Sequence, residues 1–385
     1  MDRGQGAVED VVTMPFGDVF RGRRVLLTGH TGFKGAWLAE WLLTLGAEVT
    51  GFALAPPTEP SLFVQLGLEA RLDHHPGDIR DEAAVRRVVD DARPEFVFHL
   101  AAQSLVRLSY AQPVGTFATN AMGTAHVLEA IRLAGRPCVV VSVTSDKCYE
   151  PREGSAAFCE DDRLGGHDPY SSSKAAAELV IAAYQRSFFQ ADRAPGVALA
   201  SGRAGNVVGG GDWAADRLVP DAMAALDRGV PIPVRNPLST RPWQHVLEPL
   251  AGYLALAAAL AEAQRENDRA RVADLASSFN FGSHPDSTRS VRDVVAEILK
   301  HRTGTWNATG DANAVHEAVT LNLAIDKAAD LLGWTPVWGF ERAIAETVRW
   351  YRSAVDSDPD ELTREQIRAY LHEASAAGLR WAVGR

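Results

Sequence analysis

The sequence predicts an α/β fold built on a doubly wound parallel sheet. Short apolar runs recur along the chain with helix-like stretches between them, and a glycine-rich turn follows the first run. Parallel strands need crossover connections, so strands that alternate with helices indicate a parallel sheet. The expected strands cover residues 25–27, 49–53, 96–100, 138–143 and 197–201.

The glycine-rich turn carries Gly29, Gly32 and Gly35, and a helix-like stretch starts at Ala36. A side chain at this turn would hold a pyrophosphate away from the free backbone N–H groups, and the positive end of the helix attracts the anion. The spacing is G-x-x-G-x-x-G, and three glycines among 32 are a weak signal alone. With a second motif downstream, the turn predicts a Rossmann-type dinucleotide site.

The second motif is Tyr170-x-x-x-Lys174, which puts a phenol and an ammonium on one face of a helix, one turn apart. A surface pair on a helix is the ordinary explanation for this spacing. Together with the glycine turn, the motif predicts hydride transfer to a nicotinamide with Tyr170 as the base. We expect Lys174 to lower the pKa of Tyr170 and to orient the nicotinamide ribose.

Polar side chains follow the expected strand 138–143 in the order Ser145, Asp146 and Lys147. Ligands bind at the carboxyl ends of strands in open α/β sheets, although loops are generally polar as well. Because Tyr170 and Lys174 are also present, we interpret this run as part of a catalytic site. Ser145 is expected to hydrogen-bond the reacting hydroxyl.

Two further segments are candidates for cofactor contacts. Asp78 is placed to accept a hydrogen bond from the adenine amine, but an N-cap for the helical stretch from Asp81 explains it nearly as well. Small residues at 100–102 would allow close approach of a cofactor, and simple packing explains them almost equally. Residues 51–54 offer neither an acid for a free 2′-hydroxyl nor an arginine for a 2′-phosphate, so NAD and NADP both stay open at this point.

The second half of the chain contains candidates for a sugar-nucleotide diphosphate, which is well matched by planar guanidinium groups. We take Asn206 and Arg241 as ligands and Arg217 and Arg235 as further candidates, since exposed arginines are usually only solvated. Three other groups near the motifs are expected to be ordinary surface groups: His30, Lys34 and His245.

Composition limits the class of protein. A formal net charge of −10 argues against nucleic acid or an anionic membrane as a partner, and no run of about 18 apolar residues occurs. Cys138, Cys148 and Cys159 are spaced for neither a zinc site nor a disulfide framework, so reduced thiols and no metal are expected. We expect a soluble, cytoplasmic protein with a small-molecule partner.

A length of 385 residues allows two lobes at roughly 150 residues each. We expect a flexible tail at 1–20, a Rossmann domain at 21–205 with returning segments from the second half, a mainly substrate-binding lobe at 206–355 and a helical extension at 356–385. Apolar helices are expected near 248–263 and 291–300 in the second lobe. An amphipathic helix at 361–374 is expected to be a surface flap or a subunit contact.

The motifs together resemble the extended short-chain dehydrogenase/reductase family, and within it the nucleotide-sugar 4,6-dehydratases. The resemblance runs from about residue 23 to 351 and includes, in family order, T-G-x-x-G-x-x-G, G-D-I-R, H-L-A-A, T-N-x-x-G-T, Y-x-x-x-K and G-R-A-G-N. It implies a tightly held NAD. The implied cofactor contacts are Gly29, Thr31, Gly32, Phe33, Gly35, Asp78, Ile79, Leu100, Ala101, Ala102, Asn120, Tyr170 and Lys174, and the implied substrate contacts are Gln103, Asn206, Arg217, Arg235 and Arg241.

Position 147 separates groups within these dehydratases. Those that act on dTDP-glucose or GDP-mannose resemble this chain but carry glutamate where it has Lys147. The lysine, with GHTGFKG, AAQSLVR, TSDKCY, RPWQHV and the tail LTREQIRAY, is similar to the group that acts on CDP-glucose. This resemblance implies that Asp146 protonates the departing C6 hydroxyl and that Lys147, or a water it positions, removes the C5 proton.

Two alternatives stay open. A nucleotide-sugar 4-epimerase shares Tyr-x-x-x-Lys but lacks an acid/base pair for eliminating water, and Asp146 and Lys147 favour the dehydratase. A catalytically silent sensor of NAD or sugar nucleotide would be expected to lose Tyr170 or Lys174, and both are present. A homodimer or homotetramer is expected, with subunits pairing through helices at 116–134 and 170–190.

Overall fold

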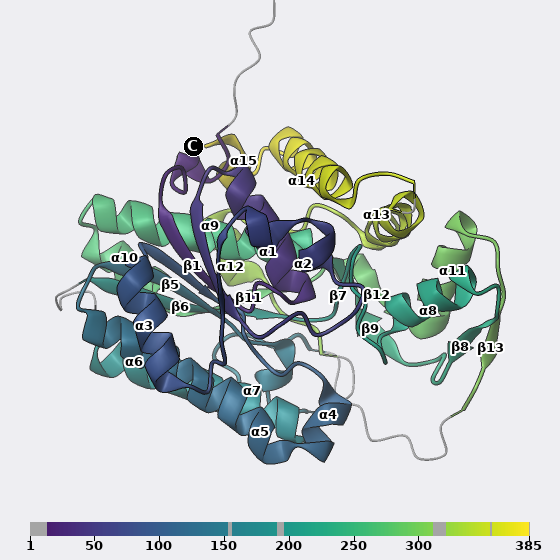
Figure 1. The fold of residues 1–385 in the computed structure, drawn as a ribbon, viewed down its shortest axis with the longest axis horizontal. Helices are drawn as coiled ribbons and strands as arrows, with labels where there is room; N and C mark the ends of the chain where they lie inside the picture. Colours follow the sequence, from purple (N-terminus) through teal and green to yellow (C-terminus); the bar gives the residue numbers. More distant parts are fainter. Residues whose placement is uncertain (1–13, 153–155, 191–195, 311–320, 355, 385) are drawn as a thin grey trace, which may run out of the picture.

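A seven-stranded sheet forms the centre of the computed structural model, which describes residues 14–152, 156–190, 196–310, 321–354 and 356–384 (Figure 1). The strand order is β11-β6-β5-β4-β1-β2-β3, and every pair of neighbours is parallel. The strands are β1 (Arg24–Thr28), β2 (Glu48–Ala53), β3 (Asp73–Pro76), β4 (Phe96–His99), β5 (Cys138–Val143), β6 (Val197–Ala204) and β11 (Ser278–Phe281). The predicted doubly wound fold is therefore confirmed.

Helices cover both faces of this sheet. One face carries α3 (Glu82–Ala92), α6 (Gly123–Ala134) and α7 (Pro169–Ser187), which pack against one another in order. The other face carries α1 (Phe33–Thr44) and α9 (Leu247–Arg265), with α13 (Phe340–Ser353) and α14 (Pro359–Ala376) outside them (Figure 1). Each face has its own buried apolar cluster, because a parallel sheet is covered on both sides.

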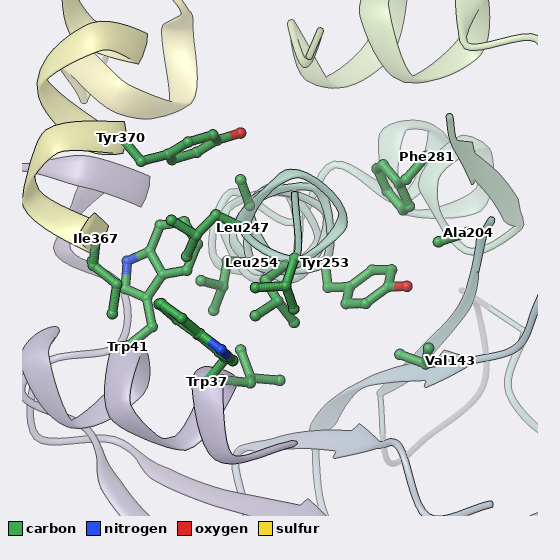
Figure 2. Packing of buried hydrophobic residues seen from close by; sticks show 14 of the residues in the cluster. Trp37, Trp41, Val143, Ala204, Leu247, Tyr253, Leu254, Phe281, Ile367 and Tyr370 are labelled. Atoms are coloured by element: carbon green, nitrogen blue, oxygen red, sulfur yellow. The ribbon is translucent and has the colours of Figure 1, made fainter. Parts of the chain in front are cut away.

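The larger cluster joins the C-terminal helix to the sheet (Figure 2). Trp41 of α1 meets Tyr370 of α14 edge to face, with ring centroids 5.9 Å apart. Both rings are fully buried, and burying a large apolar side chain contributes roughly 1.5–3 kcal/mol. The predicted helix at 361–374 is thus present as α14, but its inner face packs on α1 and α13 of its own chain.

Part of the N-terminal segment belongs to the described structure. Residues 1–13 of the predicted tail lie outside the described residues. Phe16 and Phe20 from the same segment are buried in the larger cluster, where Phe16 stacks on Trp381 with centroids 5.2 Å apart. The part of the expected tail that follows residue 13 is therefore built into the core.

A smaller lobe lies at one end of the molecule (Figure 1). It contains α8 (Leu218–Asp227), α11 (Val291–His301), the parallel pair β8 (Ile232–Val234) and β13 (Trp306–Ala308), and the antiparallel pair β9 (Thr240–Pro242) and β12 (Thr288–Ser290). The helix expected near 248–263 is α9, and it packs on β5 and β6 instead of joining this lobe. The second half of the chain thus returns to the central sheet through α9 and β11.

The remaining elements are short. They are β7 (Val207–Val208), β10 (Gln244–His245), α2 (Leu62–Gln65), α4 (Val106–Ala111), α5 (Pro113–Phe117), α10 (Arg269–Leu275), α12 (Asp326–Leu332) and α15 (Arg380–Val383). Among the described residues, every helix is too short or too polar to cross a bilayer. The three cysteines are free thiols, of which only Cys159 is exposed.

Candidate active site

A short helical turn, Asp146–Cys148, follows β5 and carries the predicted acid, Asp146. We call it the acid turn. Ser145 caps this turn, since its hydroxyl accepts from the Lys147 N–H at 3.2 Å and donates to Asp146 Oδ1 at 2.9 Å. The Asp146 side chain is buried, and this burial raises its pKa, while Lys147, Ser145 and Arg241 oppose the rise. A carboxyl in such a place retains its proton to higher pH than an exposed aspartate and is suited to act as an acid.

Helix α7 brings the second motif to the same end of β5. Asp168 caps the helix by accepting from Ser171 N–H at 2.9 Å, and Pro169 opens it. Tyr170 and Lys174 are both buried, and Lys174 Nζ donates to the Val143 carbonyl at 3.3 Å. These residues are therefore not a solvated surface pair, and Tyr170 lies close enough to Ser145 for that hydroxyl to affect its pKa.

The protonation states differ from one sequence expectation. Burial raises the pKa of Tyr170 to about 12, although the hydrogen bond with Ser145 and the charge of Arg217 act in the other direction. The sequence predicts that Lys174 lowers this pKa, but desolvation of the buried phenol is the largest effect and raises it. Burial likewise lowers the pKa of Lys174 to about 8, and the nearby Glu178 carboxylate opposes that change.

The glycine turn fits a bound pyrophosphate. A Cβ at Gly35 would lie 2.1 Å from the Gly29 carbonyl oxygen, and a Cβ at Gly29 would lie 2.7 Å from the Ala101 nitrogen. Glycine is thus required for the turn to pack against the segment after β4. Gly32 caps α1 without a side-chain hydrogen bond, so the first N–H groups of the helix have no capping side chain and are available to an anion.

Other predicted cofactor residues line the same turn. Thr31 donates to the Leu54 carbonyl at 2.9 Å, and Phe33 is the first residue of α1. The Ala101 N–H donates to Thr28 Oγ1 at 3.2 Å, which fixes the segment with Leu100 and Ala102 beside the turn. The structure therefore places these predicted cofactor residues around the glycine-rich turn.

Two predicted cofactor residues, Asp78 and Ile79, already make contacts within the protein. The Asp78 carboxylate accepts from Arg80 Nε at 2.9 Å, and Arg80 lowers its pKa. Helix α3 is capped by Asp81, which accepts from Ala84 N–H at 3.0 Å, so an N-cap does not explain Asp78. The neighbouring Ile79 is buried in the smaller apolar cluster.

Asn120 is held between the segment after β4 and α7. Its amide exchanges hydrogen bonds with the backbone of Gln103, at 2.8 and 3.0 Å, and donates to Ser173 Oγ at 2.8 Å. It lies in a π-helical turn at residues 118–122, a feature that often marks functional sites. The Gln103 side chain bonds Leu105 and Thr116, so both amides organise this segment.

The predicted substrate arginines fall into two groups. Arg217 and Arg241 lie close enough to the site for their charges to act on the pKa values of Tyr170 and Asp146, respectively. Arg217 is held by Asp212 at 2.9 Å. Arg235 pairs with acids of its own lobe, Asp216 at 2.9 Å and Asp221 at 3.7 Å. Asn206 follows β6, where its carbonyl accepts from Gln244 N–H at 3.3 Å.

The site also contains a lysine that the motifs did not identify. Lys34, in the first turn of α1, was expected to be a surface group, but it lies partly buried with Nζ 5.7 Å from the centroid of the Tyr253 ring. Burial and the charges of Lys174 and Arg217 lower its pKa to about 7, and Asp146 opposes this. Within the described residues, the buried Tyr253 hydroxyl has no hydrogen-bond partner. The position of this lysine inside the glycine-rich turn is the sequence feature that could have identified it.

The family model described as GDP-mannose 4,6 dehydratase matches residues 26–347, which covers the sheet, the acid turn, α7 and most of the second lobe. The chain belongs to this family. The resemblance read from the motifs is thereby confirmed, as is the extended dehydrogenase/reductase architecture that it implied.

Individual relatives agree with this assignment. The chain is 45% identical to a CDP-glucose 4,6-dehydratase of Salmonella typhimurium, over 87% of this chain and 92% of the relative. It is 26% identical to a dTDP-glucose 4,6-dehydratase of Xanthomonas campestris, over 85% and 92% of the two chains. The solved dTDP-glucose 4,6-dehydratase DesIV of Streptomyces venezuelae, with NAD and TYD bound, shares the fold with a TM-score of 0.71 and 24% identity over 86% of this chain and 97% of that one.

Proposed function

We propose that this protein is an NAD-dependent CDP-glucose 4,6-dehydratase, which converts CDP-glucose into CDP-4-keto-6-deoxyglucose and water. The observation that carries the proposal is the turn Ser145-Asp146-Lys147, with Ser145 and Asp146 buried, beside the buried Tyr170 and Lys174. This turn adds an acid and an amine to a site that can oxidise an alcohol, and elimination of water needs both. The 45% identity to a CDP-glucose 4,6-dehydratase supports the choice of substrate.

The cofactor assignment rests on the glycine turn. Its tight packing and its uncapped helix terminus suit a dinucleotide pyrophosphate, and the solved DesIV structure contains NAD. When bound, NAD supplies the hydride acceptor for C4 and the hydride donor for C6. Around it, Lys174 would hold the nicotinamide ribose, and the first N–H groups of α1, beginning at Phe33, would face the pyrophosphate.

In the proposed oxidation at C4, Tyr170 removes the proton of the C4 hydroxyl. The phenol oxygen lies near Ser145, which can bond the same sugar hydroxyl. Because burial keeps the free phenol protonated at neutral pH, formation of the phenolate depends on the cations in the pocket. Arg217 already acts in that direction, and the Lys174 ammonium lies one turn along α7.

The proposed elimination of water requires two further proton transfers, one from C5 and one to the C6 hydroxyl. The 4-keto group acidifies the C5 proton, which an amine removes as the C6 hydroxyl leaves with the proton of Asp146. The same amine would return a proton to C5, and with the hydride that bound NAD would supply at C6 the net loss is one water. The sequence assigns the C5 proton to Lys147 or a water that it positions. The lowered pKa of Lys34 makes it a second candidate amine near Asp146.

The substrate is tested by incubating the protein with CDP-, dTDP-, UDP- and GDP-hexoses and following the 4-keto product. We expect turnover with CDP-glucose and at least a tenfold preference for it, equivalent to about 1.4 kcal/mol in the transition state. Preference for another nucleotide would overturn the substrate assignment. Formation of a 4-epimer without a 4-keto-6-deoxy product would show an epimerase, and no product with any hexose would support a silent sensor.

We further propose that the subunits pair through the helical segments at 116–134 and 170–190, which include the end of α5, α6 and α7. Val114 of α5 is 81% exposed and Leu179 of α7 is 62% exposed, and Phe117 at the end of α5 and Met122 in the π-helical turn that follows it are also exposed. Apolar side chains on neighbouring helices are typical of an obligate interface. Light scattering at micromolar concentration is expected to show a dimer or tetramer, and Leu179→Glu to shift it toward monomer. A monomeric wild type would refute this interface.

A further inference from the structure

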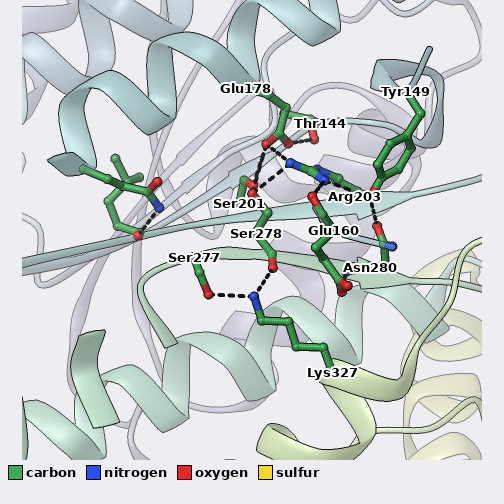
Figure 3. Close-up of polar contacts among 12 residues, drawn as sticks. Thr144, Tyr149, Glu160, Glu178, Ser201, Arg203, Ser277, Ser278, Asn280 and Lys327 are labelled. Atoms are coloured by element: carbon green, nitrogen blue, oxygen red, sulfur yellow. Dashed lines mark hydrogen bonds and ion pairs between the residues drawn. The ribbon is translucent and has the colours of Figure 1, made fainter. Parts of the chain in front are cut away.

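Glu178 is a buried carboxylate on α7 that no motif singles out. It lies one helical turn beyond Lys174, and its side chain is 2% exposed. One oxygen accepts from the Thr144 hydroxyl. The other accepts from Arg203 Nη2 at 2.7 Å, Ser201 Oγ at 3.0 Å and Ser278 Oγ at 3.2 Å (Figure 3). Four donors therefore converge on one carboxylate.

Arg203 of β6 extends this network to the segment that follows the acid turn. Its Nη1 donates to the Tyr149 hydroxyl and to the Glu160 carbonyl, both at 2.8 Å. Tyr149 in turn donates to Asn280 Oδ1 of β11 at 2.7 Å (Figure 3). A buried ion pair costs much desolvation and often adds little net stability, so its geometry points to a role other than stability alone.

The network holds both ends of the acid turn. Thr144 directly precedes Ser145, and its N–H donates to the Gly202 carbonyl at 2.9 Å while its hydroxyl bonds Glu178. Tyr149 directly follows the turn and bonds Arg203, the ion-pair partner of Glu178. The position of Asp146 relative to Tyr170 thus depends on groups that bond Glu178 or its partner.

Glu178 also sets the charge environment of Lys174. The titratable groups that face this lysine are Glu178 on its own helix, Cys148 from the acid turn, His99 from β4 and Lys34 from α1. Glu178 favours the ammonium form, whereas burial disfavours it and leaves the pKa of Lys174 at about 8. Because the Cys148 thiol is buried with a raised pKa, it is neutral, and Glu178 is the anion that favours the ammonium.

We propose that Glu178 is a positioning residue for the reaction, which holds the acid turn in place through Thr144 and keeps the Lys174 ammonium charged. The proposal rests on the dehydratase function proposed above. It assigns two separable effects to one carboxylate, a geometric effect through the hydroxyl of Thr144 and an electrostatic effect through space on Lys174.

The test compares pH profiles of cofactor reduction and of 4-keto product formation for Glu178→Gln, Glu178→Asp and Thr144→Val. In Glu178→Gln the base-side midpoint, near pH 8 in the wild type, is expected to fall by about one unit, because an amide lacks the charge that supports the ammonium. The kcat is expected to fall by about tenfold or more with KM within about twofold. Thr144→Val is expected to lower kcat without moving the midpoint.

Ser278→Ala is the matched control, since it removes one donor to Glu178 and leaves the carboxylate charged. It is expected to keep the wild-type midpoint. A Glu178→Gln enzyme that loses rate equally at every pH overturns the electrostatic effect, and a fully active Thr144→Val enzyme overturns the geometric one. If Glu178→Gln does not fold, the Glu178→Asp enzyme provides the test, because it retains the charge on a shorter side chain. A wild-type midpoint with reduced kcat then supports the proposal, and a shifted midpoint overturns it. Failure of the proposed function is seen separately, as absence of 4-keto product from the wild type.

Discussion

Two glycines of the same turn are expected to fail in different ways when each is changed to alanine. A Cβ at Gly35 would lie 2.1 Å from the Gly29 carbonyl oxygen and 2.8 Å from the His30 Cα, and all of the nearest atoms are backbone. The turn must therefore shift by about 1 Å or more, at a cost of about 1–3 kcal/mol for overpacking. At Gly32 the nearest atom is 3.5 Å away and φ is −81°, so alanine fits the free protein.

The Gly32→Ala enzyme is expected to fold normally and to lose cofactor. Its new methyl group would stand where a pyrophosphate approaches the first N–H groups of α1. Loss of one hydrogen bond to a charged group costs about 1.5–3 kcal/mol, which corresponds to roughly 10- to 100-fold weaker NAD binding. The measurements are the dinucleotide released per subunit on denaturation, calorimetric titration with NAD, and the melting temperature.

Gly339→Ala is the matched control for this experiment. Gly339 caps α13 in an extended conformation like that of Gly32, and no atom lies within 4 Å of its Cβ position. It therefore reports the cost of replacing a glycine N-cap, about 1 kcal/mol or less, away from the cofactor. Wild-type NAD affinity in Gly32→Ala, or a wild-type melting temperature in Gly35→Ala, would refute the interpretation of the turn.

Three further outcomes are expected at the catalytic residues. Tyr170→Phe should lower C4 oxidation by about 10²–10⁴-fold with the fold intact, and near wild-type turnover would show another base. The double variant Asp146→Asn, Lys147→Met should accumulate reduced nicotinamide absorbance on addition of CDP-glucose with little 4-keto product, and undiminished dehydration would remove both residues from the mechanism. Activity should fall as pH rises through about 8, where Lys174 loses its proton, and Lys174→Met should abolish this limb of the profile; a limb that survives the substitution belongs to another group.

The sheet could be predicted where its strands are continuous apolar runs. Strands β1, β2, β4, β5 and β6 are buried on both faces, and such strands show their burial directly in sequence. Strand β3 reads Asp-His-His-Pro and lies at the sheet edge, where it needs no apolar run. Strand β11 is short and is separated from β6 by the first part of the small lobe and by α9, so its return to the sheet is a property of tertiary packing.

The candidate site, like the sheet, could be predicted only in part. Residues 145–147 and the pair Tyr170 and Lys174 carry local signals, because a strand end and a helical spacing are readable in sequence. Burial is not readable in this way, and it raises the pKa of Tyr170 to about 12 where charge alone predicted a fall. Arg80, two residues from Asp78, likewise occupies the carboxylate that was assigned to adenine.

Lys34 and Glu178 show why the missed residues escaped detection. Each stands next to a motif and has an ordinary explanation as a solvated helix residue. Each becomes unusual only when elements far apart in sequence enclose it: α9 brings Tyr253 to Lys34, and β6 and β11 bring Arg203 and Ser278 to Glu178. A charged group inside such an enclosure changes the protonation of its neighbours, because low polarity strengthens every charge interaction. The motifs therefore name the groups that would meet the substrate, while the packing of the sheet decides the pH range in which those groups carry the charges that the reaction needs.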